Sequence, residues 1–497
     1  MLSLLSNTWA LLFGMLLLMM GNGMQGSLLG IRGAIEGFSA GEMSLVMSGY
    51  FLGFLIMSRA APGMIRRVGH VRVFAAMGSI ISAVFILYAA FPNVWAWGLM
   101  RVAVGTCFAA VYVVAESWFN DSATNENRGK ALSLYMTTQM LGVISAQALL
   151  NLADPGGYDL FVLISVAVSL SFAPILLSVS PAPVHQTTKP MSLRALFVAS
   201  PLGVVGTVFL GAVFSAIFGM SSVYGTAKGL SVAQISIFVA LIYVGGLISQ
   251  FPVGWLSDRM DRRRLILIMT ALGAAAGLAG AMAGDYVIVV LGMAAVIGGI
   301  ANPLYSLLIA HTNDYLEAED RAAASGGLLF LNGVGAVGGP LAVGALMETF
   351  GPWAFFGFVL TMFAIIAVYA AWRMTRRPSV APDETVAYTL VAPGATPVTR
   401  PVWTTDMPSV MARATASGRA SPRALSPLAF PRAPLPLALP RAPLPRASRR
   451  PILRPQSRAS ESAMTTTPAQ VLDFWFEQLG PSAWFGGGPA VDEAIRA

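Results

Sequence analysis

Twelve apolar stretches, each about as long as a membrane-spanning helix, dominate the first 373 residues of this chain. A helix that crosses a bilayer needs roughly 20 apolar residues, and these stretches meet that length and are bounded by Gly, Pro or charged residues. We therefore predict an all-α membrane protein with twelve transmembrane helices. The stretches are Trp9–Leu29, Met43–Ile65, Val73–Phe91, Trp95–Trp118, Ala131–Leu152, Tyr158–Val179, Pro201–Tyr224, Ser231–Leu256, Leu265–Ala283, Tyr286–Ala310, Ala323–Leu346 and Trp353–Arg373.

Composition excludes several other classes of protein. Only 11% of the residues are charged, whereas soluble domains contain about 25%. The single cysteine, Cys107, cannot form a disulfide within the chain. The net charge of +8 is divided evenly at Arg377, and the apolar part has no basic stripe with interleaved aromatic residues, so we expect no nucleic-acid partner. The first stretch lacks a basic leader and a cleavage site, which predicts a retained helix and not a signal peptide.

The loops between the stretches differ in their content of Lys and Arg. If the N-terminus is cytoplasmic, the outside loops carry only Arg32 and Lys228, and all the other loop cations lie inside. The positive-inside rule then places both termini in the cytoplasm and the chain, as a multi-pass protein, in a bacterial cytoplasmic (inner) membrane.

The two sets of six stretches form a sequence repeat with an offset of 193 residues. The offset aligns these pairs: Tyr112 with Tyr305, Asn120 with Asn313, Asp121 with Asp314, Glu126 with Glu319, Arg128 with Arg321 and Gly142 with Gly335. We expect a first six-helix half over residues 1–179, a cytoplasmic connector over 180–200 and a second half over 201–377. Parallel repeats of this kind hold a substrate site at mid-membrane between the halves.

The turn Gly254–Arg264, GWLSDRMDRRR, lies between the eighth and ninth stretches. It resembles the signature loop of the major facilitator superfamily, G-x-x-x-D-R-x-G-R-R, although Asp261 stands where that pattern has Gly. The resemblance implies the twelve-helix major facilitator fold and a conformational-switch loop. In this half the residues of that loop are Gly254, Asp258, Arg259, Arg262 and Arg263.

The first-half copy of this turn departs from the pattern. It retains Gly63, Gly69 and Arg72, but Arg66 occupies the acidic position. We expect a first-half switch that is weak or built from other residues. Arg128 and Arg321, which the repeat aligns, are assigned to the same switch machinery.

The resemblance also implies that the first, fourth, seventh and tenth helices line the transport cavity. Our candidates for substrate contact on these helices are Gln25, Arg101, Tyr112, Asn302 and Tyr305. No cluster of acidic residues lines this path, which argues against a polycationic substrate.

Two charged residues in the fourth stretch are candidates for proton coupling. Arg101 begins an R-x-x-x-G pattern similar to that of proton-coupled antiporters of the superfamily, but it lies near the outer boundary and an anchoring role is equally open. Glu116 lies 15 residues further on, roughly 22 Å along a helix, so the two cannot pair. For Glu116, a structural ion pair and a proton-binding carboxyl both stay open. The stretch around Glu116 resembles an uncharacterised bacterial, sugar or drug efflux-like branch of the superfamily.

After Arg377 the composition changes to Pro, Ala, Arg and Ser. Residues 378–463 cannot form an apolar core, so we expect a disordered tail. Residues 464–497 resemble the beginning of an unrelated soluble helical family, and a frameshift or readthrough is our hypothesis for their presence.

The function predicted from these observations is secondary active transport of a small molecule by alternating access, as proton-coupled efflux. The alternatives are a facilitative uniporter or importer and a non-transporting membrane scaffold. No catalytic or nucleotide-binding motif is present, so we expect no enzyme activity. We further expect no cofactor or metal ion and a monomeric protein, whose partners are the lipid bilayer, a small-molecule substrate and protons.

Overall fold

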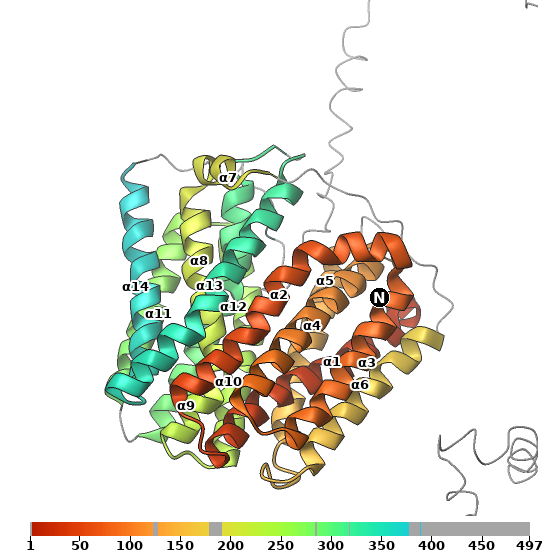
Figure 1. The fold of residues 1–497 in the computed structure, drawn as a ribbon. Helices are drawn as coiled ribbons and strands as arrows, with labels where there is room; N and C mark the ends of the chain where they lie inside the picture. The colour runs from red at the N-terminus through yellow and green to blue at the C-terminus, as the bar shows by residue number, and fades with distance from the viewer. Residues whose placement is uncertain are drawn as a thin grey trace, which may run out of the picture. The chain divides into compact units, whose positions relative to one another are not determined.

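The structure is a computed structural model that describes residues 2–122, 128–177, 191–283, 286–317, 319–376 and Tyr388. All of them belong to one compact unit, Met1–Met411; a second unit, Ala412–Ala497, lies outside the described residues, as do the predicted tail (apart from Tyr388) and the predicted C-terminal fragment. Within the described ranges the secondary structure is entirely helical (Figure 1). The helices are α1 (Leu2–Ile35), α2 (Ala40–Val68), α3 (His70–Ala90), α4 (Val94–Ser122), α5 (Arg128–Leu149), α6 (Asp159–Leu177), α7 (Leu193–Ala199), α8 (Pro201–Gly219), α9 (Ser221–Ala227), α10 (Val232–Ser257), α11 (Arg262–Met282), α12 (Val287–Asn313), α13 (Arg321–Phe350) and α14 (Ala354–Met374).

Each of the twelve apolar stretches contains one long helix. Among the described residues, 11 helices are long and apolar enough to cross a membrane. The remaining long helix, α5, has 22 residues but is less apolar, because Gln139 and Gln147 lie on it. Both glutamines are buried, so these amides face neighbouring helices and not lipid.

The seventh stretch is interrupted at Met220, which separates α8 from the short helix α9. Ser221 and Ser222 follow the break, and serine hydroxyls compete with the helical backbone for hydrogen bonds. Ser221 Oγ donates to the carbonyl of Ile217, and Ser222 Oγ donates to the carbonyl of Gly26 at 3.3 Å. The hydrogen bond between Ser222 and Gly26 therefore links the second half to α1 at this interruption. The connector contains a second short helix, α7, which the apolar pattern does not predict.

The two halves are built by the same helix pairings. In the first half α2 packs on α4, α1 on α5 and α3 on α6; in the second half α10 packs on α12, α8 on α13 and α11 on α14. Figure 1 shows the first half in red to gold and the second half in olive to cyan. Equivalent helices also begin alike, because Ser39 with Glu42 and Ser231 with Gln234 form capping boxes at α2 and α10.

Two glycines related by the 193-residue offset bring these helices into close contact. A Cβ atom on Gly105 of α4 would lie 1.9 Å from the carbonyl oxygen of Tyr50 on α2. A Cβ atom on Gly298 of α12 would lie 2.0 Å from the carbonyl oxygen of Ile242 on α10. Small residues allow such backbone approaches between membrane helices. The sequence repeat is therefore a repeat of packing.

The halves contact each other mainly through α2 with α13, α5 with α10 and α1 with α9. Asn151, just beyond α5, donates from Nδ2 to Ser236 Oγ near the start of α10 at 3.1 Å. Gly344, near the end of α13, faces Ser44, near the start of α2. These contacts lie at the end of the helices where α1 and α5 finish and where α2 and α10 begin. The two halves are in direct contact at that end.

Candidate functional site

A cavity lies between the halves, and helices of both halves line it. Its walls come from α1, α2, α4 and α5 of the first half and from α8, α10, α12 and α13 of the second. Its volume is about 220 Å³. Because one water molecule needs about 10–15 Å³ of such space, the cavity has room for roughly fifteen waters or one small solute.

Many lining residues are related by the offset of 193. The pairs are Tyr50 with Tyr243, Met136 with Leu329, Gln139 with Asn332, Met140 with Gly333 and Val143 with Ala336. Our sequence-based site included none of these residues, although the offset was known from the loops. Extending the same alignment through the helices would have found the two tyrosines and the two amides as matched pairs.

Arg101 is the one charged residue among the described residues that line the cavity. The residue is only 4% exposed. Its Nη1 donates to Gln25 Oε1 at 2.9 Å, its Nη2 lies 3.1 Å from Met47 Sδ, and its guanidinium carbon lies 5.0 Å from the centre of the Tyr50 ring. Arg101 therefore points into the protein and does not snorkel to a membrane surface.

The structure separates the five predicted substrate contacts into two groups. Arg101, Tyr112 and Asn302 line the cavity. Gln25 and Tyr305 lie outside its lining: Gln25 is fully buried and links Arg101 to the Tyr88 hydroxyl, and Tyr305 packs edge-on against Phe214. Substrate contact itself stays a prediction for all five.

Glu116 lies near the C-terminal end of α4 and is 3% exposed. It is not one of the residues that line the cavity. Arg101 contacts Gln25 on α1 and Met47 on α2, and the two charges of α4 do not meet, as their spacing requires. A role of either charge in proton coupling stays a prediction.

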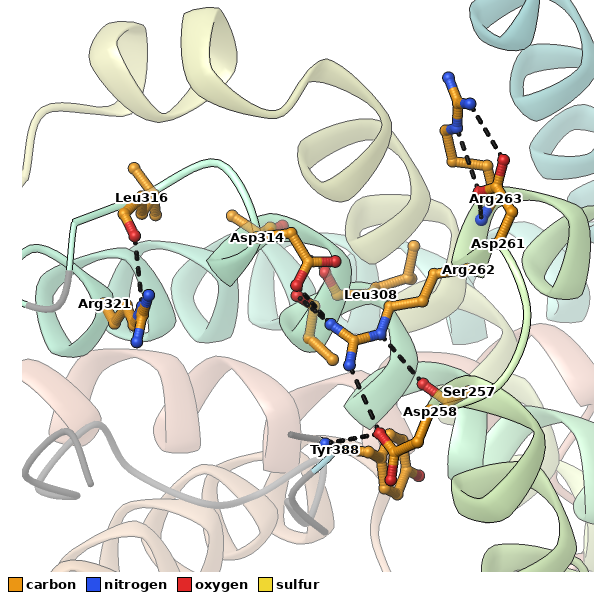
Figure 2. A network of polar contacts seen from close by, with 12 residues as sticks. Ser257, Asp258, Asp261, Arg262, Arg263, Leu308, Asp314, Leu316, Arg321 and Tyr388 are labelled. Atoms are coloured by element: carbon orange, nitrogen blue, oxygen red, sulfur yellow. Dashed lines mark hydrogen bonds and ion pairs between the residues drawn. The ribbon is translucent and has the colours of Figure 1, made fainter. Parts of the chain in front are cut away.

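The switch loop of the second half is organised around Arg262 (Figure 2). This side chain, 2% exposed, forms an ion pair with Asp314, which caps the C-terminal end of α12 and whose side chain is 3% exposed. Its Nε donates to Ser257 Oγ at 3.1 Å, and its Nη1 donates to the carbonyl of Ala310 at 3.2 Å. Arg262 therefore ties the start of α11 to the ends of α10 and α12.

Asp261 explains the departure from the glycine of the superfamily pattern. Its carboxylate caps α11 by accepting the backbone N–H of Arg263 at 2.9 Å, and it also accepts from Arg263 Nη2 at 3.0 Å. Partial burial raises the pKa of this carboxyl, but the hydrogen bonds and charge of Arg263 outweigh that effect, so the pKa lies below its ordinary value.

Asp258 and Gly254 both contact Tyr388. Asp258 Oδ1 accepts the backbone N–H of Tyr388 at 3.0 Å and lies 3.6 Å from Arg262 Nη2. A Cβ atom on Gly254 would lie 2.9 Å from the Tyr388 ring. The Tyr388 hydroxyl donates to the carbonyl of Pro303 at 3.4 Å. Tyr388, eleven residues beyond Arg377, thus contacts the predicted switch loop and α12.

The other predicted switch residues make simpler contacts. Arg259 is exposed, lies over the Trp255 ring and donates to the Trp255 carbonyl at 3.2 Å. Arg321 donates from Nε to the Leu316 carbonyl at 3.2 Å. The side chain of Arg128 lies outside the described residues.

In the first half, Gly69 ends α2 with φ +87°, a conformation that favours glycine, whereas a Cβ atom on Gly63 would lie 4.0 Å from Arg66 Nη2. Arg66 and Arg72 are exposed. A first-half switch that is weak or built from other residues stays a prediction.

Comparisons with known proteins agree with this architecture. A family model described as Major Facilitator Superfamily matches residues 11–246 and, in a second match, residues 203–435. The chain belongs to the major facilitator superfamily. The first match covers the first half except the beginning of α1, and the second match covers the second half except the first two residues of α8.

A relative from Escherichia coli (strain K12 / DH10B), the uncharacterized MFS-type transporter YcaD, is 27% identical over 346 residues, which are 68% of this chain and 88% of the relative. Two solved structures share the fold. The nucleoside transporter NupG has a TM-score of 0.62 at 15% identity, over 74% of this chain and 98% of that one. A bacterial homolog to the human lysosomal transporter Spinster, inward-facing and unoccupied, has a TM-score of 0.58 at 15% identity, over 74% and 95%. The predicted twelve-helix superfamily fold is confirmed.

Proposed function

We propose that this superfamily member is a secondary active transporter that moves a small molecule across the bacterial cytoplasmic membrane by alternating access, as proton-coupled efflux. The observation that carries the proposal is the cavity between the halves, which is lined by repeat-related positions of α2 with α10 and of α5 with α13. A substrate site at a repeat interface lets one site face either side of the membrane when the halves rock.

The arrangement of contacts between the halves supports alternating access. The Asn151–Ser236 hydrogen bond and the Ser44–Gly344 contact close one end of the interface. Under the positive-inside rule this end is extracellular and both termini are cytoplasmic. On this orientation the structure corresponds to a state that is closed to the outside.

Proton coupling and the direction of transport rest on narrower observations. Arg101 is buried beside the cavity in the R-x-x-x-G pattern, and Glu116 is a buried carboxyl on the same helix. A facilitative uniporter or importer would use the same fold and cavity without a proton. A scaffold would retain the fold without turnover. NupG is named a nucleoside transporter, but at 15% identity it supports only the fold and gives this chain no substrate.

A disulfide lock tests alternating access directly. Asn151→Cys and Ser236→Cys are introduced together in a Cys107→Ala background, which removes the chain's one native cysteine. A ligand-stabilisation screen supplies a substrate, and its radiolabelled form is followed by counterflow in proteoliposomes. Oxidation should abolish counterflow, and a reductant should restore it, whereas each single-cysteine variant should be unaffected. Equal counterflow in the oxidised and reduced double variant would reject alternating access.

The same proteoliposomes separate the coupled mechanism from its alternatives. An imposed pH gradient should drive net transport of the substrate, and Arg101→Ala or Glu116→Gln should weaken that dependence. Transport that ignores the gradient in both the parent and the variants would favour the uniporter, and absence of counterflow for every stabilising ligand would favour the scaffold.

A further inference from the structure

We propose that the cavity selects a small organic anion, a carboxylate or a phosphate ester with an apolar body, and that Arg101 binds its charged group. The proposal rests on the proposed transport function and specifies its substrate class. It is carried by the charge, the unpaired hydrogen-bond donors and the apolar surface of the cavity.

The cavity is positively charged without compensation from its own walls. Arg101 lines it, and the described residues of the lining include no Asp or Glu. Arg101 contacts Gln25, Met47 and Tyr50, all of which are uncharged. Among the described residues Arg101 forms no ion pair. A buried charge is normally paired, because removing it from water without a partner is costly. An anionic ligand would supply the missing partner.

Among the residues that the structure describes, the second half adds no charge to this site. The residue equivalent to Arg101 is Ala294, which is buried in α12. Glu116, the one acidic residue of α4 with a described side chain, lies outside the lining and is separated from Arg101 by roughly 22 Å of helix. Arg101 therefore sets the sign of the electrostatic potential in the cavity.

Two buried donors of residues that line the cavity have no hydrogen-bond partner among the described residues. They are Nε of Arg101 on α4 and Nε2 of Gln139 on α5. Gln139 is 8% exposed, and its counterpart Asn332 does have a partner, the carbonyl of Thr207 at 3.4 Å. Unpaired buried donors favour a ligand rich in acceptor oxygens. Carboxylate and phosphate groups have only acceptor oxygens when ionised, and they bind guanidinium well.

The rest of the lining fits the apolar body of such a ligand. Aromatic and methionine side chains make up much of the wall: Met19, Tyr50, Phe51, Phe54, Tyr112, Met136, Met140, Phe214, Phe218 and Tyr243. Their surface would bury an apolar ring or chain, and the volume of about 220 Å³ limits the ligand to a small molecule. A bare inorganic anion would leave this surface uncovered.

Four probes of similar shape and different charge test the proposal on the full chain in detergent. Benzoate and phenyl phosphate are anionic, benzamide is neutral and benzamidine is cationic. Binding is measured by isothermal titration calorimetry at pH 7.5 for the parent protein, Arg101→Lys, Arg101→Gln and the control Arg194→Gln. Arg194 is an exposed residue of α7, a helix that contributes no described residue to the cavity lining.

At least one anion should bind the parent protein about tenfold or more tightly than benzamide, and benzamidine should bind most weakly. Arg101→Gln should remove this preference, Arg101→Lys should retain part of it, and Arg194→Gln should leave it unchanged. The relative affinities of benzoate and phenyl phosphate identify which headgroup is preferred. Thermal unfolding of each variant, followed without ligand, separates loss of binding from loss of folding.

Equal affinity for the four probes, stronger binding of benzamide or benzamidine, or no binding of either anion would overturn the proposal. So would an anion preference that survives in a folded Arg101→Gln variant. None of these outcomes changes the result expected from the counterflow experiment with the disulfide lock, because that experiment tests transport of a ligand of any charge. Conversely, anion binding without counterflow would reject the transport function and retain the anion site.

Discussion

The buried ion pair between Arg262 and Asp314 provides the sharpest test of the switch loop. Asp314→Asn removes the negative charge but keeps the shape of the side chain and one acceptor oxygen. The Arg262 guanidinium would then remain 2% exposed, with its hydrogen bonds to Ser257 and the Ala310 carbonyl but without the carboxylate of α12. Its nearest other carboxylate in the loop, Asp258, lies 3.6 Å away and has a side chain that is 46% exposed.

The expected cost follows from this burial. Removing one partner of a buried ion pair costs about 3–5 kcal/mol, because the remaining charge is left without compensation. Asp258 offsets the charge of Arg262 only weakly, because its side chain is 46% exposed to water. We therefore expect Asp314→Asn to lower the free energy of unfolding by about 3 kcal/mol. For a unit the size of one six-helix half, this corresponds to a fall in Tm of roughly 6–12 °C.

A thiol-reactive dye can follow the unfolding. Cys107 is the single cysteine and is buried in α4, so the dye reacts only when the helices separate. Asp261→Asn is the matched control, because it removes a carboxylate from the same loop whose side chain is 21% exposed in its pair with Arg263. Pairs in contact with solvent contribute about 0.2–1 kcal/mol, so the control should shift Tm by at most a few degrees.

A double-mutant cycle completes the test. Arg262→Met alone should be destabilising by a similar amount, since it leaves Asp314 buried without its cation. Arg262→Met combined with Asp314→Leu should recover much of the loss, because apolar replacements of a buried pair are often close to neutral. If Asp314→Asn is no more harmful than Asp261→Asn, and if the cycle shows a coupling below about 1 kcal/mol, this account of the loop is wrong.

Three further predictions concern other parts of the chain. Gly298→Ala should cost about 1–3 kcal/mol in thermal unfolding, because its Cβ would lie 2.0 Å from a backbone oxygen of α10, whereas Gly292→Ala on the same helix meets open space and should be neutral. The pKa of Asp261 lies below its ordinary value near 3.8, so the ionised carboxyl should contribute its full stability above pH 3.8. This contribution should disappear as the pH falls through the lowered pKa, and the Tm difference between the parent and Asp261→Asn should vanish with it. Tyr388→Ala should lower Tm by a few degrees through lost burial of its ring, and Tyr286→Ala, whose ring is already 72% exposed, should not.

The helices were predictable because each apolar stretch carries its own length signal, which does not depend on the rest of the chain. The short helices were not. α7 has seven residues and α9 has seven, so neither has the length that identifies a membrane span. The break at Met220 depends on a contact made far away in sequence, between Ser222 and Gly26 of α1. Such tertiary contacts have no local pattern.

The family resemblance indicated four of the eight helices that line the cavity, α1, α4, α8 and α12, but not which of their side chains do so. Knowing that α1 and α12 border the cavity does not tell which face of each helix is turned towards it. Gln25 and Tyr305 lie on the right helices, but they pack behind Arg101 and Phe214. Successive residues of a helix differ by about 100° in direction, so a difference of one or two positions moves a side chain out of the lining.

The departures from the repeat show where each half carries its charges. Equivalent positions share packing, as Gly105 and Gly298 do, because both halves must pair the same helices at the same spacing. Buried charges do not follow this rule. The residue equivalent to Arg101 is Ala294, and the buried Arg262 of the switch loop lies in the second half. A second arginine at position 294 would place another cation on a cavity helix and raise the desolvation cost without a counterion. For the proposed anion site, a single Arg101 therefore carries a lower desolvation cost in the empty cavity than a symmetric pair of arginines would.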